Sequence, residues 1–209
     1  MSSHPSPNET VRRKAELRAA VLARRAALSP AEREAAANTL IDQIPDLDFP
    51  HQPSLVAGFW PIRDEIDIRP LMAALRASGH RIALPVVGPS GLTFREWDDG
   101  ETLVAAPFGT SEPGSDAAEC DPPILLVPLL AFDREGRRLG YGKGHYDGAI
   151  QRLSAAGPIQ TIGVAFATQE VDEVPVEAHD RRLDAVLTEA GLLRFSPPAG
   201  DADARSVSG

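Results

Sequence analysis

Short apolar runs of strand length recur along this chain, separated by segments with helical spacing, and this alternation constrains its fold more than any other feature. The runs predicted as strands are residues 54–60, 81–87, 124–128, 161–166 and 184–188. The run Ile124-Leu125-Leu126-Val127 is entirely apolar, which is typical of a strand buried on both faces. Strands separated by helices favour an α/β fold with three layers, α/β/α, around a mainly parallel sheet.

The helices expected between these strands have apolar periodicity or recognisable ends. They cover residues 11–28, 30–44, 68–78 and 146–156. In the first of these helices, the spacing places the apolar residues Leu17, Val21, Leu22 and Leu28 on one face. The second begins with Ser29-Pro30-Ala31-Glu32, a capping box with proline at the first helical position. The third ends at Gly79, a residue type that favours the left-handed conformation after a helix.

The remaining segments are predicted as a hairpin, loops and a tail. Residues 92–97 alternate in polarity and follow a Gly-Pro-Ser-Gly turn, which predicts an antiparallel partner for the strand 81–87. Residues 109–123 are rich in Gly, Pro, Ser and Asp and are expected to form a loop. We expect one domain over residues 1–195 and a disordered tail at 196–209, where the same residue types dominate.

The overall composition excludes several classes of protein. With 209 residues the chain is long enough for one core, and a net charge of −9 disfavours a general nucleic-acid binder, which needs a basic face. Cys120 is the only cysteine, so no disulfide can form within the chain. No run of about 18 apolar residues and no apolar signal segment is present, so we expect a cytoplasmic protein without a membrane span.

A glycine-rich run follows the buried strand at 124–128 and carries the strongest functional signal. Gly140, Gly142 and Gly144 alternate between Arg138 and Lys143 and lead into the helix at 146–156. Backbone N–H groups, a helix N-terminus and two cations together favour an anion site suited to phosphates over a flexible surface turn. The spacing matches neither the Walker A pattern nor the dinucleotide-binding fingerprint.

Other candidate residues each have a functional and a structural interpretation. Asp147 and Asp180 are oxygen ligands suited to Mg²⁺, or alternatively helix caps and turn residues. Glu65 follows a strand end beside Trp60, where it either binds a flat heterocycle or starts a helix. His145 is either a general acid or base, or a contact residue of the loop.

Basic residues on the first helix are harder to interpret. Lys14 and Arg18 are four residues apart and so share one face, which is either a cationic wall for a nucleotide or a solvated surface. The helix carries other basic residues of no evident specificity: Arg12, Arg13, Arg24 and Arg25. The spacing alone favours the solvated surface.

Taken together, these motifs resemble the 5-formyltetrahydrofolate cyclo-ligase family, also called methenyltetrahydrofolate synthetases. The resemblance spans most of the chain, and its most specific part is Val127-Pro128-Leu129-Leu130-Ala131-Phe132-Asp133 followed by residues 138–147. Further matching elements, in chain order, are Lys14 to Arg18, Pro61 to Asp67, Phe108 to Pro113, Gln169, Pro175 and His179-Asp180.

The resemblance implies an activity and a set of site residues. The activity is the ATP-dependent cyclisation of 5-formyltetrahydrofolate to 5,10-methenyltetrahydrofolate, with Mg²⁺ as cofactor, on a fold related to ribose-5-phosphate isomerase-like proteins, in a monomer or weak homo-oligomer. The implied ATP contacts are Lys14, Arg18, Arg138, Gly140, Tyr141, Gly142, Lys143, Gly144, His145 and Tyr146. Arg138 and Lys143 are the implied catalytic cations. The implied folate contacts are Trp60, Glu65, Tyr141, His145 and Tyr146, and the implied metal ligands are Asp147 and Asp180.

The chain departs from the family pattern at two positions. His145 stands where Tyr or Phe is frequent, and Gly148 stands where Arg often follows the Tyr-Asp pair. Three other interpretations remain open at this point. They are a ligand-sensing protein without activity, a sugar-phosphate isomerase or deaminase, and a relative of the cyclo-ligases that has lost folate activity.

Overall fold

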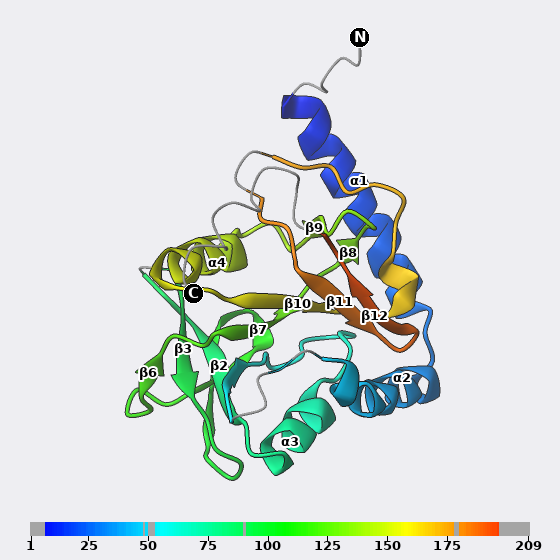
Figure 1. Cartoon of the computed structure of the whole chain (residues 1–209). Helices are drawn as coiled ribbons and strands as arrows, with labels where there is room; N and C mark the ends of the chain where they lie inside the picture. The colour runs from blue at the N-terminus through cyan, green and yellow to red at the C-terminus, as the bar shows by residue number, and fades with distance from the viewer. Residues whose placement is uncertain (1–6, 48, 50–52, 90, 178–179, 197–209) are drawn as a thin grey trace.

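The central feature of the computed structural model is an eight-stranded sheet within the residues it describes, 7–47, 49, 53–89, 91–177 and 180–196 (Figure 1). The strand order is β12-β11-β10-β7-β1-β2-β3-β6. The strands are β1 (Leu55–Ala57), β2 (Arg81–Gly88), β3 (Gly91–Glu96), β6 (Glu119–Cys120), β7 (Ile124–Pro128), β10 (Gln160–Val164), β11 (Ala185–Thr188) and β12 (Gly191–Arg194).

Parallel pairing dominates the middle of this sheet. Strands β2, β1, β7, β10 and β11 pair in parallel, while β3, β6 and β12 join antiparallel at the two edges. The pairing of β2 with β3 is the predicted hairpin. The mainly parallel sheet and the central position of β7 are therefore confirmed.

Helices cover both faces of the sheet and complete the three predicted layers. The helices are α1 (Pro7–Ala26), α2 (Pro30–Asp42), α3 (Arg69–Ala77) and α4 (His145–Ala156). On one face, Leu40 of α2 and Leu75 of α3 pack on Leu126 of β7. On the other face, Leu153 of α4 packs on Leu125 of the same strand. This arrangement explains why β7 is apolar at every position from 124 to 127.

Helix α1 lies apart from these layers and packs on a small hairpin (Figure 1). The hairpin consists of β8 (Ala131–Phe132) and β9 (Arg138–Leu139), which pair antiparallel. Val21 of α1 is fully buried in a cluster with Ala131 and Leu139, and Leu17 packs against the same cluster. Since the hairpin leads directly into the glycine-rich loop, this contact fixes α1 beside that loop.

Some sequence predictions of individual elements were wrong. The segment 109–123 is not a continuous loop, because it contains β5 (Ser111–Pro113), which pairs with β4 (Leu103–Ala105), and also β6. Strands β4, β8, β9 and β12 were not predicted. Most have only two or three residues, too few to show alternation. Leu28 lies beyond the end of α1 and packs against the α2 and α3 side of the core.

Further predictions concern the ends of two helices and the C-terminal tail. The capping box at Ser29 forms, with the Ser29 side chain accepting from the backbone of Glu32 and the Glu32 side chain accepting from the backbone of Ser29. Gly79 has φ +92° directly after α3, as predicted. The tail expected to be disordered lies outside the described residues from residue 197 onward.

The strand order reverses between β1 and β7, and this point locates a cleft. From β1 the chain passes through α3 to β2 on one side, whereas β7 continues through α4 to β10 on the other side. The segments that follow the carboxyl ends of β1 and β7 therefore diverge. Those segments are residues 58–68 and 129–144, which hold many of the predicted site residues.

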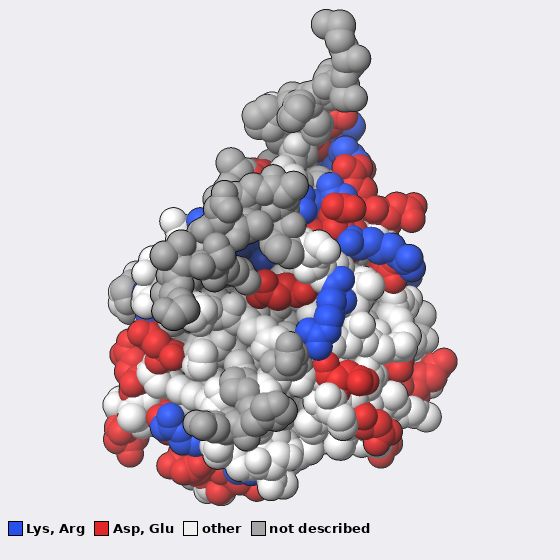
Figure 2. Space-filling model, in the orientation of Figure 1, with Lys and Arg blue, Asp and Glu red and all other residues white. Residues whose placement is uncertain are grey.

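The surface shows a mixed charge distribution. On the face drawn in Figure 2, basic and acidic side chains of the described residues are interspersed. Among the helices of the described ranges, none combines the length and the apolarity that a membrane span requires.

Two glycine substitutions test the packing of this fold. A Cβ at Gly163 in β10 would lie 2.5 Å from Leu129 Cδ2 and 2.7 Å from Leu183 Cδ1, so Gly163→Ala should lower the free energy of unfolding by about 1–3 kcal/mol. A Cβ at Gly148 in α4 meets no atom within 4 Å. Because alanine favours a helix more than glycine does, Gly148→Ala should raise the free energy of unfolding by up to about 1 kcal/mol. Urea unfolding followed by circular dichroism measures both, and equal effects of the two would contradict the packing described.

Candidate active site

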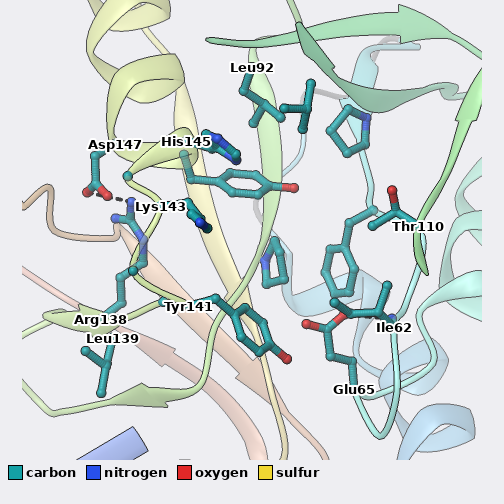
Figure 3. A pocket seen from close by; sticks show the side chains of 18 of the residues that line it. Ile62, Glu65, Leu92, Thr110, Arg138, Leu139, Tyr141, Lys143, His145 and Asp147 are labelled. Carbon is teal, nitrogen blue, oxygen red and sulfur yellow. Dashed lines mark hydrogen bonds and ion pairs between the residues drawn. The ribbon is translucent and has the colours of Figure 1, made fainter. Parts of the chain in front are cut away.

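A pocket of about 430 Å³ opens at the strand reversal, between segments that are distant in sequence. All of the predicted site residues line it: Lys14, Arg18, Trp60, Glu65, Arg138, Gly140, Tyr141, Gly142, Lys143, Gly144, His145, Tyr146, Asp147 and Asp180. Figure 3 shows Arg138, Lys143 and Asp147 on one side and Glu65, Ile62 and Thr110 on the other. The pocket therefore has one strongly cationic wall and one wall with aromatic and acidic character.

The glycine-rich loop forms the cationic wall through its backbone conformation. Gly142 has φ +88° and Gly144 has φ +66°, which are conformations that other residues rarely adopt. The Arg18 guanidinium donates from Nε to the Gly140 carbonyl at 3.0 Å. It also lies close to Gly142, since a Cβ at that position would be 3.2 Å from the NH2 group of Arg18. The N-cap residue of α4 is Gly144, which has no side chain to cap the helix, so the first amide groups of α4 can bind an anion.

Arg138 is buried at the base of this loop. Its NH2 group donates to Asp147 Oδ1 at 2.8 Å, and its NH1 group donates to the Arg181 carbonyl. Burial lowers the pKa of Arg138, although the charges of Asp147 and Asp180 oppose this effect. The side chain stays charged because an arginine does not lose its proton in proteins. Arg138 is thus a fixed cation in a region with little water.

Lys14 is buried as well, which excludes the solvated-surface interpretation favoured by its spacing. Only 6% of the residue is exposed. Its Nζ donates to Glu177 Oε2 at 2.6 Å and to Asp180 Oδ2 at 2.7 Å. Burial alone lowers the pKa of Lys14, but the two carboxylates outweigh it and the pKa is raised. The ammonium group is therefore charged at neutral pH.

The opposite wall comes from the segment after β1. Trp60 lies at the pocket and contacts Trp97 edge to face, with 5.9 Å between ring centroids. Glu65 Oε2 accepts a hydrogen bond from the Ile62 amide at 3.0 Å. Burial raises the pKa of Glu65, and the Ile62 amide, Tyr141 and the charges of Arg25 and Arg63 oppose the rise. An aromatic face and a buried carboxyl group suit a flat heterocycle with N–H donors.

Two tyrosines connect the two walls. Burial and the charge of Glu65 raise the pKa of Tyr141 to about 12, and they raise that of Tyr146 further. The Tyr146 hydroxyl is buried and has no hydrogen-bond partner in the part of the chain described here. Both hydroxyl groups therefore stay protonated at neutral pH, and that of Tyr146 can donate to a bound ligand.

Two carboxylates of the pocket can contribute to a metal site. Among the described residues, no group of three or more His, Cys, Asp or Glu side chains could hold a metal ion. Mg²⁺ needs only one or two carboxylates when phosphates and waters complete its coordination. Asp147 accepts both of its hydrogen bonds, from Arg138 and the Arg181 amide, through Oδ1, and Asp180 lines the same pocket. These donors fit a Mg²⁺ ion that arrives with a nucleotide.

Some residues of the pocket were not predicted from the sequence. Glu177 binds Lys14, and Arg63 lines the wall beside Glu65 with φ +53°, a conformation unusual for arginine. The apolar lining includes Phe59, Ile62, Pro85, Val87, Leu92, Pro128 and Leu139. The Glu65 segment and the acidic residues at 177–180 carried a sequence signal, but the apolar lining looks like ordinary core.

Fold and pocket together define an α/β protein in which a glycine-rich cationic loop faces a wall with aromatic and acidic side chains. Comparison with known proteins gives the family. Residues 10–189 match the model of the 5-formyltetrahydrofolate cyclo-ligase family, so the chain belongs to that family. The chain is 35% identical over 189 residues to the 5-formyltetrahydrofolate cyclo-ligase of Mycolicibacterium smegmatis, covering 85% of this chain and 94% of the relative. It is 34% identical over 182 residues to that of Escherichia coli K12, covering 82% and 98%.

A solved structure supports the same relationship. The NMR structure of Aquifex aeolicus 5,10-methenyltetrahydrofolate synthetase superimposes with a TM-score of 0.74 at 30% identity, covering 88% of this chain and 93% of that one. The resemblance noted in the sequence is therefore confirmed at the level of the family and the α/β fold.

Ionisation of the two tyrosines tests the burial of the pocket. Tyr141 and Tyr146 are the only tyrosines, and unfolded tyrosine ionises at about pH 10. With the Tyr141 pKa at about 12, tyrosinate absorbance should rise only above pH 10 in the folded protein and near pH 10 in concentrated urea. Because the folded state holds the proton more tightly, this stabilisation is complete below about pH 10 and is lost as the pH rises through about 12.

The control for this titration is Tyr141→Phe, which leaves Tyr146 alone. Its ionisation should then require a still higher pH, since the pKa of Tyr146 is raised more than that of Tyr141. A midpoint near pH 10 in the folded wild type would contradict the burial of both hydroxyl groups.

Proposed function

We propose that this chain catalyses the ATP-dependent cyclisation of 5-formyltetrahydrofolate to 5,10-methenyltetrahydrofolate, releasing ADP and phosphate. The observation that carries the proposal is the pairing of two sites in one pocket. A glycine-rich cationic wall faces Trp60 and Glu65 across a single cavity. Membership of the cyclo-ligase family supports the same reaction.

The chemistry explains why such a pocket needs phosphate binding next to a pterin. The oxygen of a formamide is a poor leaving group, so the formyl oxygen first attacks the γ-phosphorus and ADP leaves. Nitrogen 10 of the folate then bonds to the activated formyl carbon. The carbon–oxygen bond breaks, phosphate departs with the original formyl oxygen, and nitrogen 10 loses its proton. No protein nucleophile is required, so the residues act by positioning and by charge.

The residues of the cationic wall are assigned to ATP. Gly140, Tyr141, Gly142, Lys143, Gly144, His145 and Tyr146 surround the phosphates, with Lys14, Arg18 and Arg138 as further contacts. Arg138 and Lys143 neutralise the charge that develops on the transferred phosphoryl group. The buried position of Arg138 strengthens its effect, because a charge acts more strongly where water is excluded.

The opposite wall is assigned to the folate. Trp60 stacks against the pterin, and the Glu65 carboxylate accepts hydrogen bonds from its N–H groups. Tyr141, His145 and Tyr146 lie where the two substrates meet, and the Tyr146 hydroxyl offers a donor there. His145, found where the family often has Tyr or Phe, provides a flat ring at the same place.

Asp147 and Asp180 are assigned to Mg²⁺ bound with ATP. The ion supplies charge neutralisation at the phosphate oxygens. Both aspartates hold cations of the pocket, since Asp147 accepts from Arg138 and Asp180 accepts from Lys14. They therefore fix the positions of these two side chains as well as offering oxygen atoms.

We also propose a location, an oligomeric state and a class of binding partner for the protein. A cytoplasmic location agrees with a single cysteine that cannot form a disulfide within the chain. A monomer or weak homo-oligomer is the oligomeric state that the resemblance to the cyclo-ligase family implies. The net charge of −9 supports a small-molecule enzyme over a nucleic-acid binder.

The direct test is an absorbance measurement at the methenyltetrahydrofolate band after mixing the protein with 5-formyltetrahydrofolate. We expect absorbance to rise only when ATP and Mg²⁺ are both present, with one ADP formed per methenyl product. Binding of ATP measured by calorimetry serves as the control. Binding without any absorbance rise would overturn the proposal in favour of a sensor or a relative without folate activity.

Removal of one loop cation tests its catalytic role. Lys143→Ala should lower kcat/KM by about 10²- to 10³-fold, the effect of losing one preorganised charge at a transition state. Arg134→Ala is the matched control, because Arg134 is exposed, pairs with Glu170 and does not line the pocket. Steady-state turnover measures both variants, and wild-type turnover of Lys143→Ala would remove Lys143 from the mechanism.

A further inference from the structure

Arg25 is a buried cation that the proposed reaction does not use. It lies in the last turn of α1 and is 0% exposed, whereas its neighbour Arg24 is exposed. Its Nε is 3.8 Å from Asp64 Oδ2, too far for a hydrogen bond. Within the described residues, its Nε and NH1 have no hydrogen-bond partner.

The NH2 group of Arg25 reaches the pocket through a tyrosine. It donates to the Tyr141 hydroxyl at 3.0 Å. That hydroxyl and the Glu65 carboxyl group point toward one another in Figure 3, and their interaction opposes the rise in the pKa of Glu65. Since a tyrosine hydroxyl that accepts a hydrogen bond can still donate its own proton, it can accept from Arg25 and donate toward Glu65. Arg25 does not itself line the pocket.

The burial of Arg25 disfavours folding. A buried guanidinium whose ion-pair partner, Asp64, is 3.8 Å away and whose Nε and NH1 donors are unsatisfied lowers the stability of the folded state. An apolar side chain of similar length would avoid that cost. A role at the pocket explains why a cation lies here, because the same low-dielectric surroundings that make it costly also extend its effect to Glu65.

We propose that Arg25 is a positioning residue of the pocket: it holds the Tyr141 hydroxyl against Glu65 and keeps the Glu65 carboxyl group ionised. The chain of contacts joins α1, the glycine-rich loop and the segment after β1. The groups around Glu65 are Arg25 from α1, Tyr141 and Tyr146 from the loop and α4, and Arg63 from its own segment.

The inference rests on the proposed function for its consequence. An ionised carboxylate accepts hydrogen bonds from the N–H groups of a pterin, whereas a protonated one places a competing proton at the same site. Burial raises the pKa of Glu65, so the group is protonated more readily than an exposed glutamate unless a cation opposes the rise. Arg25 supplies that opposition from a helix outside the pocket.

The test titrates Glu65 directly in the protein without ligand. The carbon-13 chemical shift of its side-chain carboxyl, assigned by its absence in Glu65→Gln, reports the protonation midpoint. Arg25→Met should raise this midpoint by about one pH unit, the lower end of the effect of an opposite charge nearby. Arg25→Lys should restore it at least in part. Arg24→Met, on the exposed side of the same helical turn, should leave it unchanged.

A second variant separates this role from support of the fold. Tyr141→Phe removes the hydroxyl without changing α1, and it should also raise the Glu65 midpoint. This variant decides the question if Arg25→Met does not fold. An unchanged midpoint in folded Arg25→Met, or in Tyr141→Phe where the first does not fold, would overturn the inference, because a purely structural arginine would alter stability alone.

Binding of 5-formyltetrahydrofolate, followed by tryptophan fluorescence without ATP, distinguishes this inference from the proposed function. In Arg25→Met the loss of affinity at acidic pH should begin about one pH unit higher than in wild type. At a given pH in the range where affinity falls, the variant should therefore bind the folate approximately tenfold more weakly than wild type. In a Glu65→Gln background, Arg25→Met should produce no such shift. Wild-type protein that does not bind the folate would refute the proposed function, while the carboxyl titration would still decide the role of Arg25.

Discussion

The parallel pairing of β1 with β7 is the constraint on which the rest of this structure depends. Val56 and Ala57 pair with Ile124 and Leu125 at the centre of the sheet. The two strands send their following segments to opposite sides, and the pocket lies between these segments. One segment brings Trp60 and Glu65, and the other brings the glycine-rich loop. Both substrates of the proposed reaction meet because these two strands are neighbours.

Two buried cations of the pocket are each paired with carboxylates of the protein. Lys14 is held by Glu177 and Asp180, and Arg138 is held by Asp147. Such pairing lets cations stand in a region where an isolated charge would be very costly. It also fixes their positions, so little reorganisation accompanies phosphate binding. Arg25 differs because it has no comparably close carboxylate, which is why its link through Tyr141 to Glu65 is informative.

Much of the site was predictable because its chemistry is local in sequence. Gly142 and Gly144 adopt the left-handed conformations that a run of alternate glycines favours, and Arg138 lies next to the run. The burial of Lys14 and of Arg25 was not predictable from spacing, because both lie among similar basic residues on one helix. Their burial depends on the β8–β9 hairpin against which α1 packs, and strands of two residues leave no pattern.

The sequence by itself determined the α/β class, the central buried strand and the glycine-rich loop that follows it. These features follow from periodicity and from glycine's backbone freedom, which act over a few residues. Only the tertiary structure decided which cations are buried at or beside the pocket, because side chains equivalent in sequence differ in burial once the helix is packed. Arg24 is exposed and Arg25 is fully buried, although they are adjacent and identical. A helix turns about 100° per residue, so only its packing partner determines which of the two faces the protein interior.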